Sequence, residues 1–272
     1  MCEGQPVIGF SIKKVLCPVA ICGFASFAAA QSANDGDLPP PDQPKSGGRV
    51  SLAVGAKADH FGSDEARASA LPAIEYQWAN GWFAGSNRGV GYNFSKDPTL
   101  QYGVGMGLDL GRRESATGAL VGMGSIEAKV EYGAFMNFAL DRHWRLTSLL
   151  RYGSGDTGQG ATANLGVNYT LPIAPHWRLD GGASTTWANA QSMQSYFGVT
   201  ASQSQQSGNA VYSPSAGLRD LSASLKLGYQ ITPQINVSGG LSATSLMGDA
   251  RNSALVTRPD TVSANLSVGY AF

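Results

Sequence analysis

The chain of 272 residues has few cysteines, few charged side chains and no long apolar run. Its 3 cysteines, Cys2, Cys17 and Cys22, all lie within the first 30 residues. Without that segment no cysteine remains, which excludes disulfide frameworks and thiolate metal sites and suits passage through an oxidising compartment. Charged residues make up 14% of the chain and form no block of one sign, so nucleic acid is not an expected partner.

The shortness of the apolar runs excludes membrane-spanning helices, which need about 20 consecutive apolar residues. The apolar run Val15–Ala28 follows Lys13-Lys14 and leads into Ala28-Ala29-Ala30. A basic segment, a short apolar segment and small residues at the end describe a secretory signal peptide. We therefore predict that residues 1–30 are cleaved after Ala30. That loss leaves 17 basic and 18 acidic residues, a net charge of −1.

What the sequence does have is strict alternation, most clearly at its C-terminus. Apolar residues alternate with small or polar ones from Thr261 to Phe272, which predicts a strand with one apolar face. The strand ends on Phe272, with Tyr270 two residues earlier. This ending resembles the last strand of bacterial outer-membrane barrels, where it is the signal read by the barrel-assembly machinery. Tyr270 and Phe272 are the predicted assembly signal.

Similar alternation recurs through most of the chain. Pro39, Pro40, Pro41 and Pro44 mark residues 31–48 as an extended, proline-rich periplasmic arm. Residues 49–272 are then predicted to be one all-β domain, a transmembrane antiparallel up-and-down β-barrel that crosses an outer membrane. Counting Trp82–Ser86 and Arg88–Phe94 as separate strands gives twelve strands. Merging them breaks the up-and-down parity unless one more strand is lost, which gives ten, and we predict twelve. The other predicted strands are Val50–His60, Leu71–Trp78, Leu100–Leu110, Ile126–Leu140, Trp144–Tyr152, Ala161–Leu171, Trp177–Trp187, Leu221–Ile231, Ile235–Ala243 and Val262–Phe272.

The links between these strands alternate between short and long. The segments 141–143, 172–176 and 232–233 are tight, whereas 112–122, 191–217 and 248–260 are long and polar. Barrels of Gram-negative outer membranes keep short turns on the periplasmic side and long loops outside. Counting back from Phe272 places all short turns on one side, as this architecture requires.

The same parity assigns the charged side chains to the lumen. An Arg or Lys on the lipid face at mid-bilayer would cost about 2–4 kcal/mol. A paired network filling a narrow interior and a small pore both fit this pattern, because twelve strands lie between filled and channel-forming barrels. The predicted lumen charges are Asp109, Glu127, Lys129, Glu131, Arg145, Arg151, Arg178, Asp180, Asp220 and Lys226.

The longest predicted loop carries an aromatic motif, Tyr196-Phe197-Gly198-Val199. Aromatic residues bounded by polar ones are typical of an exposed contact patch. The same residues would also seal the barrel if they folded into its mouth. The sequence gives these two alternatives equal weight.

The sequence contains no recognisable catalytic group and no pattern that calls for a cofactor. The histidines are His60, His143 and His176, and the last two lie in predicted short turns, away from the outer rim and the lipid face where barrel hydrolases act. No His, Asp or Glu cluster has transition-metal spacing. We therefore predict a protein that is not an enzyme.

Several segments resemble the MltA-interacting protein/OmpV family of outer-membrane proteins, over about residues 49–272. One departure is Asn252-Ser253-Ala254-Leu255, where the family usually has Ser-Pro before an apolar pair. The segments that carry the resemblance are Arg88–Tyr92, Leu120–Ala128, Tyr196–Thr200, Ser207-Gly208, Gly217–Asp220 and Leu246–Ala250.

The resemblance implies a scaffold that brings a membrane-bound lytic transglycosylase and a peptidoglycan synthase together during cell-wall growth. Other members are described as adhesins or linked to antibiotic response. The predicted periplasmic contacts are the arm and the short turns with Arg142, His143 and Gln234. A small-solute pore lined by the lumen charges and a surface adhesin acting through residues 191–217 are the alternatives.

Overall fold

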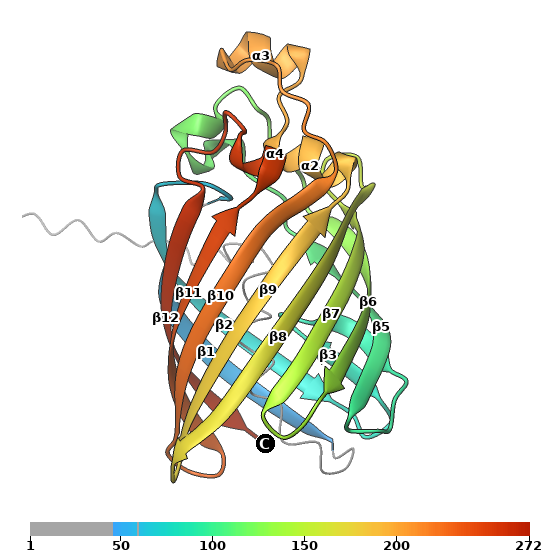
Figure 1. Cartoon of the computed structure of the whole chain (residues 1–272), viewed down its shortest axis with the longest axis vertical. Coiled ribbons are helices and arrows are strands. Elements are labelled where there is room, and N and C mark those ends of the chain that lie inside the picture. Colours follow the sequence, from blue (N-terminus) through green and yellow to red (C-terminus); the bar gives the residue numbers. More distant parts are fainter. Residues whose placement is uncertain (1–45, 59) are drawn as a thin grey trace, which may run out of the picture.

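The computed structural model describes residues 46–58 and 60–272. Twelve strands form a closed antiparallel barrel in which each strand pairs with its neighbours in the sequence and β1 pairs with β12 (Figure 1). This confirms the predicted fold class and strand number. The predicted signal peptide and most of the predicted arm lie outside the described residues. The strands are β1 (Gly47–Ala58), β2 (Ala66–Gln77), β3 (Trp82–Gly85), β4 (Gly89–Asn93), β5 (Leu100–Asp109), β6 (Lys129–Ala139), β7 (Trp144–Ser154), β8 (Gly160–Ala174), β9 (Trp177–Ala188), β10 (Gly217–Gln230), β11 (Ile235–Leu246) and β12 (Asp260–Ala271).

The two ends of the barrel differ in the length of their connections. One end, called the short-turn end below, carries the turns β2–β3, β4–β5, β6–β7, β8–β9 and β10–β11 together with Phe272. The other, the loop end, carries long connections with short helices above the strands (Figure 1). These helices are η2 (Glu114–Ala116), η3 (Gly118–Leu120), α2 (Ala190–Phe197), α3 (Ala201–Ser207) and α4 (Gly248–Arg251).

The outer surface of the wall is apolar. Along β6 and β12 the exposed and less exposed residues alternate as the sequence predicts. Val262 and Leu266 are 73% and 65% exposed, as expected for side chains that meet lipid instead of a protein core. Among residues 46–58 and 60–272, no helix has both the length and the apolar character to cross a membrane.

Aromatic pairs form a belt at the short-turn end. The rings of Trp144 and Tyr169 lie 4.6 Å apart, and those of Trp177 and Tyr229 lie 4.7 Å apart. Each pair joins the first residue of one strand to a residue near the short-turn end of the next. Trp and Tyr gather at this level in barrels that cross a bilayer.

Several strand boundaries differ from the prediction by a few residues, among them the starts of β2 and β10 and the end of β11. Two of the differences have a clear structural cause. β1 begins at Gly47, two residues before the predicted start of the barrel, because Gly48 N and O exchange hydrogen bonds with Phe272 O and N at 2.8 and 2.9 Å. β6 begins at Lys129, so Ile126 and Glu127 precede it. Ile126 instead forms an isolated antiparallel bridge with Arg112 and is buried under the loops. Glu127 is therefore an exposed loop residue and not a strand residue.

Candidate functional site

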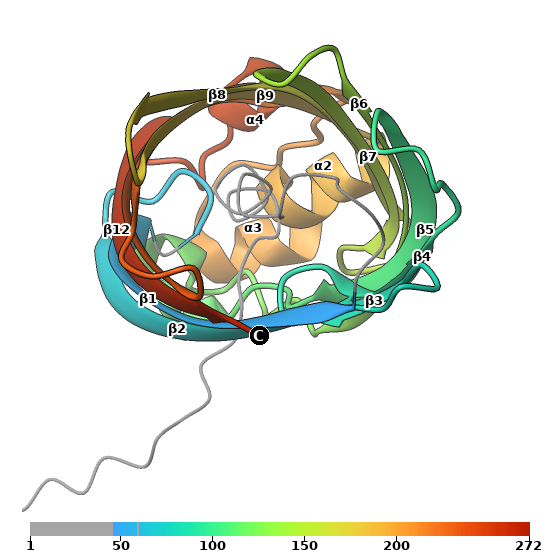
Figure 2. The ribbon, with the colours of Figure 1, turned by 90° about the horizontal axis from the view of Figure 1, so that it is seen from below.

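A central cavity of about 2390 Å³ runs through the barrel. At the short-turn end it is bordered by turn residues of several hairpins, among them Lys96, Arg142 and Gln234. At the loop end it reaches Phe61, Tyr196 and Arg219. Seen along the barrel from the short-turn end, α2 and α3 lie across the ring of strands (Figure 2).

Cross-strand pairs of asparagine and glycine line part of the cavity. Asn168 faces Gly182, and Asn265 faces Gly240. A Cβ atom added to either glycine would lie 2.8 or 2.7 Å from the asparagine Oδ1. The side-chain amides of the asparagines therefore lie against the backbone of the glycines. Because a glycine adds no side chain, the lumen stays wide and polar at these positions.

Eight of the ten predicted lumen charges border the cavity. Lys129 and Asp220 do not. The Lys129 ammonium donates to the carbonyl of Asp156 in the β7–β8 loop, and Asp220 is buried within the wall at 4% exposure. Glu127 borders the cavity only as a loop residue. Those that border it are Asp109, Glu127, Glu131, Arg145, Arg151, Arg178, Asp180 and Lys226.

Near the short-turn end the charged side chains are partly paired. Arg178 Nε lies 3.0 Å from Asp180 Oδ2, and the Thr170 hydroxyl donates to Asp180 Oδ1 at 2.8 Å. The side chain of Arg145 makes no hydrogen bond or ion pair with any other residue in the described part of the chain. The cavity thus offers a free guanidinium close to its short-turn end.

At the loop end, Asp109 joins the wall to the loops. Its Oδ2 accepts a short hydrogen bond from the Tyr196 hydroxyl and a second from the backbone N–H of Gly155 at 3.1 Å. Arg112 Nη1 donates to the Tyr196 carbonyl at 3.1 Å. Burial, with the nearby Asp109 carboxylate, raises the pKa of Tyr196. Burial lowers the pKa of Arg112, against the opposing influence of Tyr196.

A β-bulge in β10 adds a buried ion pair that alternation does not predict. The register shifts between Leu218 and Asp220, so Arg219 and Asp220 both turn inward. Arg219 Nε lies 2.6 Å from Asp220 Oδ2, with side chains 8% and 5% exposed. The Arg219 guanidinium also stacks 4.7 Å from the centre of the Phe61 ring. Strict parity would have placed Arg219 in lipid, and the bulge avoids that cost.

Apolar side chains from the loops fill the mouth at the loop end. One cluster joins Met193 and Phe197 of α2 to Leu246 and Ala250, and a second joins Met123, Val199 and Leu255. Phe197 is 1% exposed and Val199 0%. We call these two clusters and the loops that carry them the loop plug. Of the two arrangements predicted for Tyr196–Val199, the structure has the one folded into the mouth.

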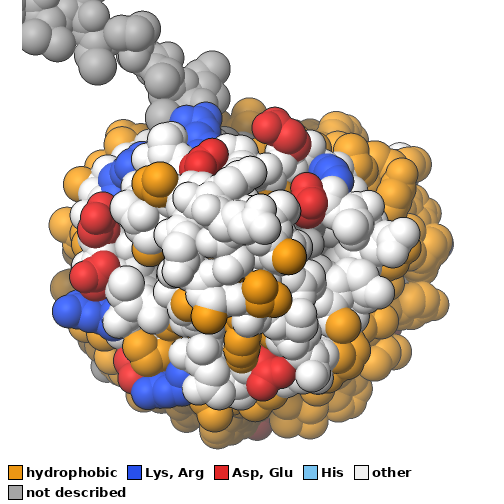
Figure 3. Space-filling view, turned by 90° about the horizontal axis from the view of Figure 1, so that it is seen from above, with side chains coloured by type: hydrophobic (Ala, Val, Ile, Leu, Met, Phe, Trp, Pro, Cys, Tyr) orange, Lys and Arg blue, Asp and Glu red, His pale blue; other side chains and the backbone are white. Residues whose placement is uncertain are grey.

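Polar contacts hold the loop plug in place. The Ser253 hydroxyl donates to the Phe197 carbonyl at 2.6 Å. Thr200 and Gln203 form a capping box at the start of α3, and Gln203 Nε2 donates to the Met123 carbonyl at 2.7 Å. Viewed from outside, the loop end is a continuous layer of atoms (Figure 3).

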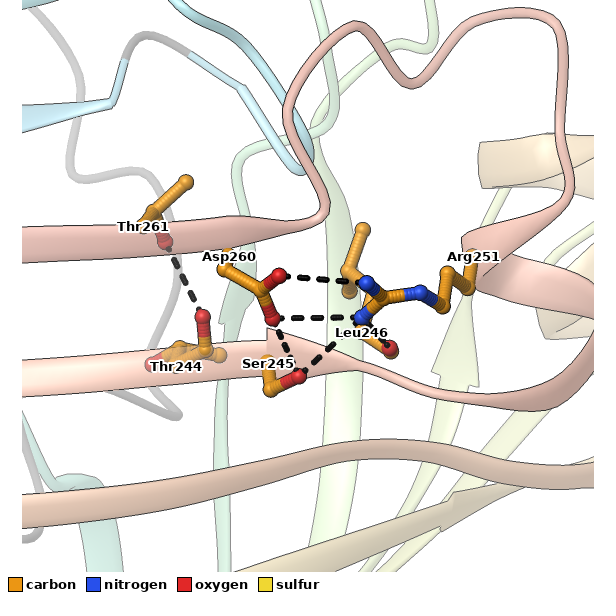
Figure 4. A network of polar contacts seen from close by, with 6 residues as sticks. All are labelled: Thr244, Ser245, Leu246, Arg251, Asp260 and Thr261. Atoms are coloured by element: carbon orange, nitrogen blue, oxygen red, sulfur yellow. Dashed lines mark hydrogen bonds and ion pairs between the residues drawn. The ribbon is translucent and has the colours of Figure 1, made fainter.

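The β11–β12 loop is tied to the barrel by an exposed network (Figure 4). Arg251 Nη2 and Nη1 donate to the two carboxylate oxygens of Asp260 at 3.1 and 3.2 Å. Arg251 Nη1 also lies 3.4 Å from the Ser245 hydroxyl and the Leu246 carbonyl. The network joins α4 to the first residue of β12.

The predicted contacts at the short-turn end lie in two ordered turns. Asp141 Oδ1 accepts the N–H groups of His143 and Trp144, both at 2.7 Å, and these bonds lower the pKa of Asp141. Arg142 Nε donates to His143 Nε2 at 3.0 Å, while His143 Nδ1 lies 2.8 Å from the Thr170 carbonyl. Gln234 ends the β10–β11 turn, and its carbonyl accepts from Ala271 N at 2.8 Å. The two turns place these side chains at the barrel rim and not in one cluster.

The buried and exposed ion pairs give a direct stability test. Replacing Asp220 with Asn is expected to lower the free energy of unfolding by roughly 3–5 kcal/mol, because the buried guanidinium of Arg219 loses its ion-pair partner. Arg251→Gln is the matched control: its pair with Asp260 is 44% and 61% exposed, so little change is expected. Urea unfolding of the barrel in lipid vesicles measures both. Equal effects of the two substitutions would contradict this ranking.

In the part of the chain that the structure describes, no group of three or more His, Cys, Asp or Glu residues is placed to hold a metal ion.

Comparison with known proteins gives one family match. Residues 50–272 match the family described as MltA-interacting protein MipA. Comparison with curated proteins gives no match. Among solved structures, the NanC porin is 11% identical with a TM-score of 0.48, covering 81% of this chain and 98% of that one. The KdgM porin is 10% identical with a TM-score of 0.46, covering 82% and 99%. An outer membrane channel from Pseudomonas putida F1 is 12% identical with a TM-score of 0.42, covering 87% and 100%.

Proposed function

Because the chain belongs to the MltA-interacting protein MipA family, we propose that it is a non-enzymatic outer-membrane barrel that docks cell-wall enzymes at its short-turn end. The partners proposed are a lytic transglycosylase and a peptidoglycan synthase. The short-turn end then faces the periplasm and the loop end faces outward, as in other barrels of this membrane.

One observation carries this proposal: the cavity is filled at the loop end and bordered by turn residues at the short-turn end. The buried side chains of the loop plug, such as Phe197 and Leu255, close the outer mouth. By contrast, Lys96, Arg142 and Gln234 border the cavity at the opposite rim. A barrel built in this way presents its concave polar surface to the periplasm.

The cavity rim also provides contact area. A stable protein–protein interface buries about 1,200 Å² or more, which tight turns alone do not supply. A partner segment that entered the cavity would add the lumen wall to the surface of the turns. Arg145, a free cation near this end, is available to pair with an acidic group of that segment.

Photocrosslinking in intact cells tests the proposal. A photoreactive residue replaces Arg142 or, separately, Gln234, and adducts are identified by mass spectrometry. We expect a transglycosylase or a peptidoglycan synthase at one or both positions. The matched control is Arg113, an exposed residue of the β5–β6 loop at the opposite end, where neither partner is expected.

Adducts with cell-wall enzymes at Arg113 alone would contradict the proposed orientation. The absence of such enzymes at both Arg142 and Gln234 would remove the proposed docking surface. A second candidate function, a small-solute pore, is favoured by the size of the cavity and by the charges that border it. Its test is the removal of the loop plug, argued in the Discussion.

A further inference from the structure

On one side of the barrel two adjacent strands, β3 and β4, are much shorter than the others. We call this side the low wall. β3 has 4 residues and β4 has 5, whereas the flanking strands β2 and β5 have 12 and 10. β3 pairs only with Glu75–Gln77 of β2. The residues of β2 nearer the loop end, 66–73, therefore have β1 on one side and no paired strand on the other.

Hydrogen bonding shows why the pairing stops. Trp78 N donates to Trp82 O, and Ser86 N donates to Ile74 O, both at 2.8 Å, so even-numbered residues of β2 direct their backbone groups towards β3. The next such residue is Pro72, which has no N–H to donate. Proline is found in sheets at such unpaired edges. Nearer the loop end, the backbone N–H and C=O groups of Ala68 and Ala70 point to the same side of β2, where no strand pairs with them.

This unpaired edge lies at the level of the lipid. Pro72 pairs with Leu52 and Ala70 with Val54 on the β1 side, and Leu52 and Val54 are 46% and 48% exposed on the apolar outer face. On the other side of the low wall, Leu108 of β5 is 50% exposed. Unpaired backbone at membrane depth is tolerated only where protein covers it or where it lines a polar cavity.

The hydrogen bonds of the β5–β6 loop connect it to the loops at the barrel mouth. Thr117 contacts His60 of the β1–β2 loop, Arg112 contacts Tyr196 of α2, and Met123 accepts from Gln203 of α3. None of these three bonds reaches residues 66–73. The outward side chains of this edge are Ala66, Ala68 and Ala70, which leave space beside the wall.

The cavity side of the same place is polar and cationic. Ser69, Asn87 and Arg88 border the cavity there. The Arg88 guanidinium lies 4.3 Å from the centre of the Phe83 ring, and no carboxylate in the described chain pairs with it. Asn87 N donates to Glu75 Oε1 at 2.9 Å, which connects the Glu75 carboxylate to the β3–β4 turn.

We infer that the space between residues 66–73 of β2 and the β3–β4 hairpin is a lateral opening that binds a single-chain amphiphile. Its apolar chain lies in the outer half of the membrane beside Ala68 and Ala70. Its anionic head group enters the cavity and pairs with Arg88. This site is independent of the docking proposed above, because it lies in the wall and not at the rim.

Lipid photocrosslinking tests the inference with the full-length barrel in vesicles. The probe is a fatty acid with a diazirine on its chain, and adducts are mapped by mass spectrometry. We expect adducts on cavity-facing residues of the opening, Ser69 and Asn87, as well as on the outer apolar face. Ser224, a cavity-facing serine in fully paired wall, is the matched control and should carry none. Adducts confined to the outer face would overturn the inference.

The head group is tested by Arg88→Gln. Loss of a charge-assisted hydrogen bond should lower the adducts of the fatty acid at Ser69 by about tenfold. A neutral monoacylglycerol with the same diazirine chain should give the same Ser69 adducts with and without Arg88. Equal loss for both probes would contradict the anionic head group, and no loss for either would remove Arg88 from the site. Arg145→Gln, a free cation at the other end of the lumen, should change neither.

Discussion

A chain in which residues 190–208 are replaced by a short Gly-Ser linker is expected to conduct ions in discrete steps, whereas the full chain is expected to be silent. The removed segment supplies Met193 and Phe197 to one apolar cluster of the loop plug and Val199 to the other. It also supplies the phenol of Tyr196 that binds Asp109. Planar-bilayer recordings with purified, folded barrel measure the change.

The matched control removes α3 alone. This helix, Ala201–Ser207, has no buried residue and gives the plug only the Gln203 hydrogen bond to the Met123 carbonyl, so its loss should leave both apolar clusters in the mouth. The control is thus expected to stay silent. Discrete conductance by the unaltered chain would contradict the seal. A folded barrel without residues 190–208 that remains silent would mean that the remaining loops close the cavity by themselves, and it would count against the pore.

Smaller changes should loosen the plug without removing it. Tyr196→Phe keeps the ring that packs beside Phe61, at a centroid distance of 6.1 Å, and removes only the hydrogen bond to Asp109. Brief openings in the same recordings are expected, because one lost hydrogen bond is a small part of the packing that holds the mouth shut. Long-lived openings like those of the deletion would show that Asp109 is the main restraint on the plug.

The strands could be predicted because alternation has a simple physical cause. A wall with lipid outside and polar cavity inside forces every second residue to one side, so stripes such as those around Leu266 and Val130 identify a strand and its outward face. The tight turn at Asn80-Gly81, with Gly81 at φ +98°, is equally local. These features need no knowledge of distant contacts.

The site could not be predicted in the same way, because it depends on contacts between distant segments. Tyr196 and Asp109 are 87 residues apart. The sequence of the loop motif alone fits an exposed and a buried arrangement equally well, and only the packing against Met193 and Leu255 shows that it is buried. The bulge at Arg219 breaks the parity rule at one residue. Ile126 continues an alternating stripe but bonds to Arg112 instead of joining β6. In each case tertiary packing overrides the local pattern.

Pro72 is the one residue in the sequence that indicates the interrupted strand pairing at the low wall. A proline within an alternating stripe marks an edge strand or an interruption of pairing. Alone it does not show which neighbour is missing, because that depends on the direction of the even-numbered backbone groups. The parity fixed by Ile74 and Trp78 supplies that direction.

Replacing Phe272 with Ala is expected to remove most of the assembled barrel from the outer membrane. We propose that this C-terminal aromatic, with Tyr270, is read by the assembly machinery before the barrel closes. In the folded barrel Phe272 also packs near Tyr76, at a centroid distance of 6.3 Å, and pairs with Gly48 where β12 meets β1. Two roles are therefore combined in one residue. Heat-modifiable migration of the protein from membrane fractions measures assembly.

Gly48→Ala separates the two roles. A Cβ atom at Gly48 would lie 2.5 Å from Phe272 Cζ, so this substitution displaces the ring in the folded barrel and leaves the C-terminal sequence unchanged. If Phe272 acts as a signal, Gly48→Ala should assemble in cells, while Phe272→Ala fails in cells but refolds from urea into vesicles. If both variants fail in cells and in vesicles alike, the residue acts through packing at the β1–β12 junction, and the signal proposal is wrong.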